Sequence, residues 1–341
     1  MELARRGWNE GRIETHTSCE PGNPVQPSKP VQAALTVDVE DYYHVAAFRA
    51  FVRPGDWGRF ESRVERNTHK VLDLFSAHGA LGTFYILGDV AERFPRLVRE
   101  IRNAGHELGC HSYAHRLIYE LTPEQFRADT ARALHAIEDA AGEPVQAYRA
   151  PTFSVTPRSS WAIDILLELG ITVDSSIFPI WHDLYGFAGA PRQPFRIVSN
   201  GASLIEFPPP TFKFGRWTLP VTGGGYLRQL PLEYQKRCLQ SLQQQGQTSL
   251  LYIHPWEFDP EQPRLEAPLG ARIRHYRGLR LTAERVGNLL KFMRFGTVTD
   301  ALASVRLGAP VHLAELGWRE PAARRASMST GWRAAAYALE I

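Results

Sequence analysis

Residues 82–115 read GTFYILGDVAERFPRLVREIRNAGHELGCHSYAH, and their pattern decides the fold class. The apolar run at 82–87 is typical of a buried strand, and residues 90–104 have the apolar spacing of a helix that ends before Gly105. A second apolar run then leads into His111. A strand, a helix and another strand in this order predict two parallel strands joined by a crossover helix.

The same alternation continues through most of the chain. Further strands are expected at residues 33–37, 146–149, 171–174 and 248–254, and further helices at 64–78, 122–141, 158–169, 232–245 and 287–294. Residues 175–220 are rich in proline and aromatic residues, with one expected strand at 204–207, and are interpreted as an insertion over the barrel. At 341 residues and 44% hydrophobic content, repeated units of this kind predict an α/β fold with a closed or nearly closed barrel of parallel strands.

Two histidines, His111 and His115, follow the second strand of the opening stretch and are four residues apart. If Ser112 begins a helical turn, both rings project from one face and can bind one metal ion. Two histidines leave a metal ion short of ligands, and the acidic residues of 38–41, at the end of the strand that begins at 33, are the best source of a carboxylate. By itself, the pair fits two ordinary surface or core histidines at least as well.

Polar residues also end several other predicted strands. Asp38, His111, Arg149, Asp174 and His254 all lie at carboxyl ends of strands. Barrel enzymes build their active sites at this face, so we expect the five side chains to form one site.

Composition narrows the choice of partner and compartment. A net charge of +3 with 22% charged residues gives the protein no strong positive field of the kind that binds nucleic acids. The arginine-rich residues 272–280 are interpreted as a solvated loop. Three widely spaced cysteines do not resemble a disulfide framework. No apolar signal core follows Met1 and no apolar run is long enough to span a membrane, so we expect a cytoplasmic protein with no transmembrane segment.

Five motifs in the expected order resemble those of the NodB-homology polysaccharide deacetylases. They are TVDVED at 36–41, HSYAH at 111–115, RAP at 149–151, DSS at 174–176 and IHP at 253–255. The resemblance covers residues 31–298 and implies a distorted (β/α) barrel of the NodB type. It also implies a metal-dependent hydrolase that removes N-acetyl groups from amino sugars. The bond that it cleaves is a carbon–nitrogen bond other than a peptide bond.

The resemblance implies a role for each acidic residue of the first motif. Asp38 is the expected catalytic base, and Glu40 is the expected carboxylate ligand beside His111 and His115. Residues two apart on a strand face the same way, which supports Glu40. If the strand ends at Val39, Asp41 takes the place of Glu40 as the ligand. The metal is expected to be Zn²⁺, with Co²⁺ or Ni²⁺ as alternatives that the same ligands suit.

The remaining motifs imply residues that assist the reaction. Arg149 is expected to hold Asp38 ionised, and His254, oriented by Asp174, is expected to protonate the departing amine. Substrate contacts are expected from three further residues, Tyr42, Pro151 and Trp256. Of the aromatic residues, Trp256 is the first candidate for stacking on a sugar ring.

A second resemblance is to deacetylases associated with exosortase and exopolysaccharide loci. It rests on DVEDYYH at 38–44, PVTGGGYLR at 220–228, HPWEFD at 254–259 and RHYRG at 274–278. That group carries a C-terminal extension, and the resemblance implies a deacetylase barrel at 31–259 followed by the extension at 260–309. The polar, proline-rich residues 1–30 are interpreted as a flexible leader and the alanine- and arginine-rich residues 310–341 as a tail. The implied partners are an N-acetylated amino-sugar polymer or its lipid-linked precursor and, peripherally, an exopolysaccharide machinery.

Two other functions remain open from the sequence. One is an allantoinase-like hydrolase of a small amide on the same scaffold. The other is a carbohydrate-binding barrel without catalysis, although a binding module needs neither a base nor an acid.

Overall fold

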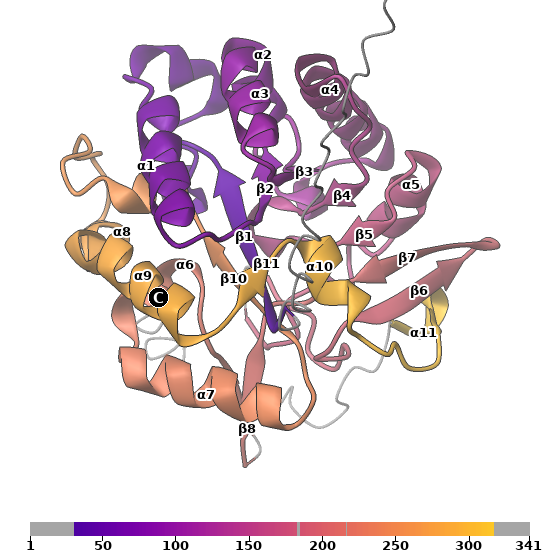
Figure 1. Ribbon diagram of the computed structural model, residues 1–341. Helices are drawn as coiled ribbons and strands as arrows, with labels where there is room; N and C mark the ends of the chain where they lie inside the picture. Colours follow the sequence, from indigo (N-terminus) through magenta and orange to yellow (C-terminus); the bar gives the residue numbers. More distant parts are fainter. Residues whose placement is uncertain (1–30, 183–184, 216, 317–341) are drawn as a thin grey trace, which may run out of the picture.

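The computed structural model describes residues 31–182, 185–215 and 217–316, and most of its strands form one curved sheet (Figure 1). Hydrogen-bonded neighbours follow the order β10 (Ser249–Ile253), β1 (Ala33–Val39), β2 (Thr83–Ile86), β3 (Glu107–Cys110), β4 (Ala147–Tyr148), β5 (Val173–Asp174), β7 (Ala202–Glu206), β6 (Phe195–Ser199) and β12 (Val311–His312). A short strand, β11 (Phe295–Gly296), pairs with the beginning of β1. All of these pairings are parallel except that of β6 with β7, which is antiparallel.

Helices cover the sheet and alternate with its strands. They are α1 (Val64–Ala77), α2 (Gly88–Arg93), α3 (Pro95–Asn103), α4 (Pro123–Ala141), α5 (Ala162–Glu168), α6 (Gly224–Gln229), α7 (Leu232–Gln244), α8 (Leu269–Tyr276), α9 (Thr282–Phe292), α10 (Val298–Ala303) and α11 (Leu313–Leu316). In Figure 1, α1 to α5 follow one another along the upper side, and α6 to α9 lie at the lower left. The predicted α/β fold, a distorted (β/α) barrel, is confirmed.

Strand β1 lies at the centre of this arrangement because both of its edges are paired and all seven of its residues are buried. Its neighbours are β10 on one side and β2 on the other, with Val37 opposite both Ile253 and Phe84. Parallel strands that are buried on both faces read as continuous apolar runs, as residues 33–37 do. The carboxyl ends of β1, β3, β4 and β10 therefore meet at one edge of the sheet.

Three predicted helices differ from the observed ones. The helix expected at 287–294 corresponds to α9, which begins earlier, at Thr282, and ends at Phe292. The helix expected at 90–104 is divided into α2 and α3 at Phe94, because Pro95 has no N–H to donate and its ring excludes the preceding turn. Residues 158–161 form turns before α5 begins. By contrast, α4 has the predicted capping box between Thr122 and Gln125, and it ends at Gly142 with a φ of 72°.

The region expected to be an insertion contains more regular structure than its sequence suggests. Strands β6 and β7 extend the main sheet, and β8 (Thr211–Phe214) pairs with β9 (Trp217–Pro220) as a separate hairpin. The first residues of the expected tail also have regular structure, because β12 pairs with β6 and α11 follows it. The expected leader at 1–30 and residues 317–341 lie outside the described residues.

Two further properties bear on the sequence-based expectations. Cys110 and Cys238 are buried and free, and Cys19 lies outside the described residues. Among the described residues, no helix is both long and apolar enough to cross a membrane.

Candidate active site and metal centre

Strand β1 delivers two carboxylates to the site, Asp38 within the strand and Glu40 directly after it. Both side chains are buried and share a side of the strand, as the period of two predicts. Oε2 of Glu40 lies 2.9 Å from Nε2 of His115. One ligand atom from each of Glu40, His111 and His115 can be chosen so that all three lie within 4.8 Å of one another, and the structure thus brings the predicted ligands together.

A tight turn, and not the predicted helical turn, brings the two histidines together. Ser112 and His115 have positive φ values of 67° and 50°, and the ring centroids of His111 and His115 are 5.4 Å apart. The turn is fixed by the hydroxyl of Ser112, which accepts a hydrogen bond from the backbone N–H of His115, and by Asp129, which accepts one from Tyr113. Backbone strain of this kind is found at functional sites, where the surroundings impose it.

The donor atoms suit a divalent metal. Nδ1 of His111 lies 2.8 Å from the carbonyl oxygen of Arg149, so it carries the proton and leaves the Nε2 lone pair available. Burial lowers the pKa of His111 to about 4, which keeps the ring neutral at neutral pH. Oε2 of Glu40 is buried and meets the geometry of no hydrogen bond among the described residues, as expected of an atom placed to bind a metal.

The charge state of Glu40 is also suitable for a ligand. Burial by itself would raise the pKa of its carboxyl group, but His115 and the nearby His254 and His111 outweigh that effect. The pKa of Glu40 is therefore held far below its usual range, and the side chain is ionised.

Asp41, the alternative ligand, is engaged elsewhere. Its Oδ2 accepts hydrogen bonds from the hydroxyl of Ser62 at 2.7 Å and from the backbone N–H groups of Arg63 and Val64 at 2.8 and 3.2 Å. Asp41 thus binds the first turn of α1, whose N–H groups have no partners within the helix. β1 ends at Val39, which is the condition under which Asp41 was the expected ligand, but it is Glu40 whose carboxylate lies with His111 and His115. The geometry therefore favours Glu40 as the carboxylate ligand.

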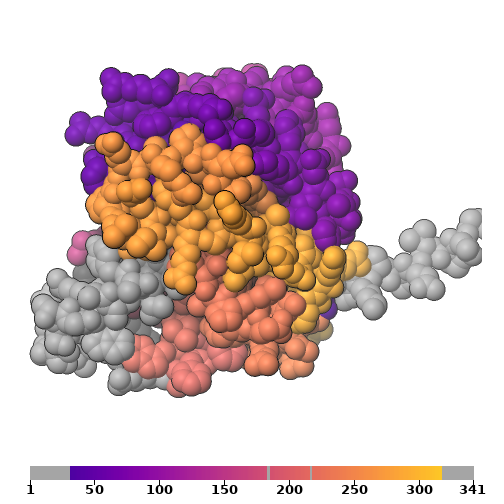
Figure 2. Space-filling view, turned by 90° about the vertical axis from the view of Figure 1, so that its left-hand side faces the viewer, coloured from indigo at the N-terminus to yellow at the C-terminus, as the bar shows by residue number. Residues whose placement is uncertain are grey.

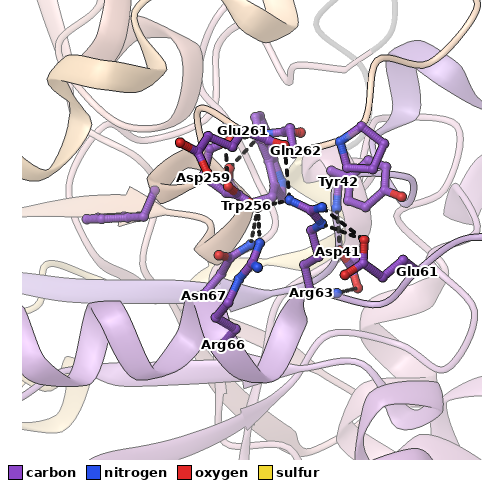
Figure 3. Close-up of polar contacts among 12 residues, drawn as sticks. Asp41, Tyr42, Glu61, Arg63, Arg66, Asn67, Trp256, Asp259, Glu261 and Gln262 are labelled. Atoms are coloured by element: carbon purple, nitrogen blue, oxygen red, sulfur yellow. Dashed lines mark hydrogen bonds and ion pairs between the residues drawn. The ribbon is translucent and has the colours of Figure 1, made fainter.

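Figure 3 shows how the same turn of α1 is joined to the segment that follows β10. The guanidinium of Arg63 lies between Glu61 on one side and Asp259 on the other, with distances of 2.9 and 3.1 Å. Arg66 adds a second ion pair to Asp259 at 2.9 Å. These contacts hold the loops after β1 and β10 together, and those loops carry Glu40 and His254.

Arg149 binds the expected base. Its Nη1 lies 2.7 Å from Oδ1 of Asp38 and 2.8 Å from the hydroxyl of Thr36, and its Nη2 donates to the hydroxyl of Ser175 at 3.0 Å. The side chain is fully buried, and its guanidinium lies 4.3 Å from the ring centroid of Tyr85. A buried charge-assisted pair of this kind fixes the orientation of the Asp38 carboxylate.

His254 faces both carboxylates of β1. Its Nε2 lies 3.8 Å from Oδ2 of Asp38 and 3.5 Å from Oε1 of Glu40. Its other nitrogen, Nδ1, lies 3.1 Å from Oε2 of Glu257. Burial disfavours the protonated ring, but the hydrogen bond and charge of Glu257, with the charges of Glu40 and Asp38, raise the pKa of His254 to about 9.

Glu257 therefore occupies the place expected for Asp174, and that expectation is corrected. Asp174 accepts hydrogen bonds from the backbone of Ser175 and the hydroxyl of Ser176 and shares a further one with Glu206. Burial raises the pKa of Asp174 to about 6 and raises that of Glu206 further above its ordinary value. Asp174 thus belongs to a buried carboxyl pair, which contacts Ser175, a residue that Arg149 also binds.

The three residues expected to contact substrate are all buried. Trp256 is 4% exposed and is stacked between His254 and His275, with ring centroids 5.3 and 4.3 Å away. Its indole N–H donates to Oε1 of Glu40 at 3.2 Å, so Trp256 orients a ligand rather than presenting a face to a sugar. Tyr42 and Pro151 are likewise covered by the protein.

Sequence reasoning missed Glu257 and its partner Arg228. Nε of Arg228 lies 2.7 Å from Oε1 of Glu257, and Nη1 donates to the carbonyl oxygens of His275 and Arg277 at 2.8 and 2.7 Å. The signal for Glu257 was present, because Pro255 at the first helical position and Glu257 two residues later give the spacing of a capping box around His254.

The glycine triplet at 223–225 lets the backbone pass close to the ring of Tyr252 beside this site. Gly223 has a φ of +101°, and a Cβ atom there would lie 2.2 Å from the ring of Tyr252. Gly224 has a φ of +48° and lies against the same ring. The two glycines allow the chain to pass over Tyr252, two residues before His254.

Two family profiles match consecutive parts of the chain. The polysaccharide deacetylase profile matches residues 56–173, and a domain of unknown function, DUF3473, matches residues 175–303. A peptidoglycan-N-acetylglucosamine deacetylase from Bacillus cereus is 26% identical over 120 residues, which is 32% of this chain and 44% of that protein. A peptidoglycan deacetylase from Helicobacter pylori is 27% identical over 124 residues, 36% of this chain and 41% of that protein. The matched region thus spans less than half the length of these relatives.

A solved structure shows the same fold. A protein from Mycobacterium smegmatis described as a polysaccharide deacetylase superposes with a TM-score of 0.53 at 19% identity, covering 81% of this chain and 90% of that one. The polysaccharide deacetylase profile and the names of these relatives agree with the predicted enzyme class. Strands β6, β7 and β10 of the DUF3473 region pair into the same sheet as β1 to β5. The region that matches the polysaccharide deacetylase profile and the region that matches DUF3473 therefore contribute strands to one continuous sheet.

Proposed function

We propose that this protein is a metal-dependent hydrolase that removes N-acetyl groups from the amino sugars of a polysaccharide or its precursor. One observation carries the proposal. Asp38, fixed by Arg149, faces His254 at 3.8 Å directly beside the three candidate ligands. Amide hydrolysis needs a base for the attacking water and an acid for the departing amine, and this arrangement provides both within one buried site.

Glu40, His111 and His115 would hold the metal, with Zn²⁺ as the first candidate and Co²⁺ or Ni²⁺ as alternatives. Bound there, a divalent metal lowers the pKa of a water molecule and polarises the acetyl carbonyl group. Trp256 and the carbonyl oxygen of Arg149 orient Glu40 and His111, as outer-shell partners of metal ligands do.

Asp38 would accept the proton of the attacking water. Its Oδ1 is engaged by Arg149, whereas its Oδ2 is directed towards His254 and is available for the proton. The guanidinium holds the carboxylate in one orientation, so no reorganisation is needed when the proton arrives.

His254 would donate a proton to the departing amine. With its pKa raised to about 9, the ring is protonated at neutral pH and can act as the acid. Glu257 accepts from Nδ1 and from the backbone N–H of His254, so the donating atom is Nε2, the atom that faces Asp38.

The substrate class is drawn from the relatives. The similar proteins include a peptidoglycan-N-acetylglucosamine deacetylase, a peptidoglycan deacetylase and a chitooligosaccharide deacetylase, and the first of these names specifies an N-acetylated sugar. The motifs shared with the exosortase-associated group support an N-acetylated exopolysaccharide or its lipid-linked precursor as the substrate. A site of action on the cytoplasmic face of the membrane, beside an exopolysaccharide machinery, fits a lipid-linked substrate.

Acetate release tests the proposal. The full chain, reloaded with Zn²⁺, Co²⁺ or Ni²⁺ and compared with a chelated sample, is expected to release acetate from oligomers of N-acetylglucosamine. Release that is equal with and without metal would contradict the proposal. If there is no release although metal is bound, ureide hydrolysis with allantoin tests the related amide-hydrolase alternative. Failure there too would leave a carbohydrate-binding barrel as the better account.

A further inference from the structure

Helix α8 presents apolar side chains to solvent. Its inner face, Ala271 and His275, is buried against Phe48, whose ring lies 4.7 Å from that of His275. At 100° per residue, Leu269 and Ile273 lie on the opposite face, where they are 70% and 51% exposed. A surface helix of a globular protein normally has the reverse arrangement, with its apolar stripe towards the core. Exposed apolar side chains that cluster in this way mark an interaction surface.

Arginines surround these two side chains. Residues 269–281 contain four arginines and no acidic residue. Arg272 lies beside Ile273 on α8, and Arg277 and Arg280 follow within one turn of the end of the helix. In the part of the chain that the structure describes, no recorded ion pair involves Arg272, Arg277 or Arg280. Leu281, five residues after the end of α8, is also exposed, at 44%.

The surface lies directly outside the proposed active site. His275, on the inner face of α8, stacks on Trp256 at 4.3 Å, and Trp256 donates to the candidate ligand Glu40. Arg228 joins the end of α8 to Glu257 through the carbonyl oxygens of His275 and Arg277. In Figure 1, α8 lies at the outer left of the molecule, on the side that faces the viewer in Figure 2.

We propose that this surface, defined by Leu269, Ile273, Leu281, Arg272, Arg277 and Arg280, binds the protein peripherally to an anionic lipid bilayer. Leucine and isoleucine side chains can enter the boundary between headgroups and acyl chains, while arginines beside them pair with lipid phosphates. Apolar side chains at the centre of the surface favour a bilayer over a nucleic acid, whose backbone is bound through charge alone. The arginines also disfavour a second copy of the same surface, because two copies would place like charges opposite one another.

This proposal deepens the proposed function. A bilayer at α8 would lie on the side of the site that His275 and Trp256 cover, and bilayers are where lipid-linked amino sugars are found. The surface is nevertheless distinct from the catalytic residues, so the two claims can be tested separately.

Vesicle co-sedimentation of the full chain tests the surface. We expect binding to vesicles of phosphatidylcholine with phosphatidylglycerol, little binding to phosphatidylcholine alone, and loss of binding in high salt. Arg272→Ala with Arg277→Ala and Arg280→Ala should weaken binding by about fivefold for each arginine. Leu269→Ser with Ile273→Ser should weaken it by at least about tenfold.

Matched variants elsewhere on the surface serve as controls. They are Arg59→Ala with Arg96→Ala and Arg158→Ala for charge, and Phe214→Ser, 69% exposed on β8, for apolar area. These controls should bind as the unaltered chain does. The proposal is overturned if the unaltered chain does not sediment with anionic vesicles, or if the controls lose as much binding as the α8 variants. It is also overturned if light scattering shows a dimer that Leu269→Ser with Ile273→Ser converts to a monomer, because a second copy then covers the surface.

Acetate release from a water-soluble N-acetylglucosamine oligomer, measured on the same samples, separates this proposal from the proposed function. The α8 variants should keep this activity. If no sample releases acetate but the unaltered chain binds anionic vesicles through α8, the bilayer surface stands and the proposed reaction fails.

Discussion

Oε2 of Glu257 accepts a hydrogen bond from the backbone N–H of His254 at 2.8 Å and lies 3.1 Å from Nδ1 of the same residue. The other oxygen of Glu257 is held at 2.7 Å by Arg228. The imidazole is thus fixed in one tautomer and one orientation by a carboxylate three residues further along the chain. This relationship predicts that Glu257 matters for protonation of the leaving group.

The variant Glu257→Gln should slow amide hydrolysis by roughly 10²-fold in kcat, at the lower end of what general acid catalysis contributes, with little change in KM. Hydrolysis of 4-nitrophenyl acetate should be spared, because nitrophenolate leaves without a proton. The comparison requires steady-state kinetics on both substrates. Glu261→Gln is the matched control, since Glu261 is an exposed residue of the same segment (Figure 3). Equal losses on the two substrates would show that Glu257 acts only on the fold.

Glu40 and Asp41 should respond differently to substitution. Glu40→Gln should lose bound metal, measured by atomic emission after dialysis, with little change in the stability of the metal-free protein. Asp41→Ala should retain metal but lose about 1–3 kcal/mol of unfolding free energy in urea, because the N–H groups of Arg63 and Val64 lose their acceptor. The reverse pattern would make Asp41 the ligand.

The pair of Asp174 and Glu206 should make stability depend on pH. Burial raises the folded-state pKa of Asp174 from 3.8 to about 6, so the folded chain binds more protons than the unfolded chain between these values. The part due to Asp174 is complete below pH 3.8 and is lost as the pH rises through about 6, by an amount on the order of 3 kcal/mol, and Glu206, whose pKa is raised further, extends the loss to higher pH. Urea unfolding at pH 4.5 and pH 7 measures it.

Glu206→Gln provides the comparison for that experiment. Its amide group can donate to Asp174 without a shared proton, so the loss of stability between pH 4.5 and pH 7 should be smaller than in the unaltered chain. An equal loss in both proteins would mean that the pair contributes nothing to the pH dependence.

The sequence was sufficient to predict most of what repeats along the chain. The parallel strands and several helices follow from apolar periodicity, and the capping box at Thr122 is local chemistry that can be read directly. Asp38, His111, Arg149 and His254 were placed at strand ends, and the structure brings these four together.

What the sequence could not predict depends on contacts between distant segments. Asp174 and Glu257 both carry a carboxyl group, so the sequence does not show which of them pairs with His254. The packing of the segment after β10 decides that Glu257 does. Trp256 is a residue type that often stacks on sugars, but here His275 of α8 packs against its ring and covers it. The turn at 111–115 depends on left-handed residues, Ser112 and His115, that periodicity does not reveal. The expected domain limits at 259 and 309 remain predictions.

Acetate release by Asp38→Asn, beside the unaltered chain and with both proteins loaded with Zn²⁺, tests the central claim most directly. Asparagine preserves the size of the side chain and can still accept from Arg149, so the fold and the metal content should be retained. The unfolding free energy should fall, because the buried guanidinium of Arg149 loses its counter-charge, and the rates are compared where both proteins are folded. Asparagine has no carboxylate to take a proton, and the rate of acetate release should therefore fall by at least about two orders of magnitude. A rate close to that of the unaltered chain, at equal metal content, would contradict the role of Asp38 as the base and with it the proposed reaction.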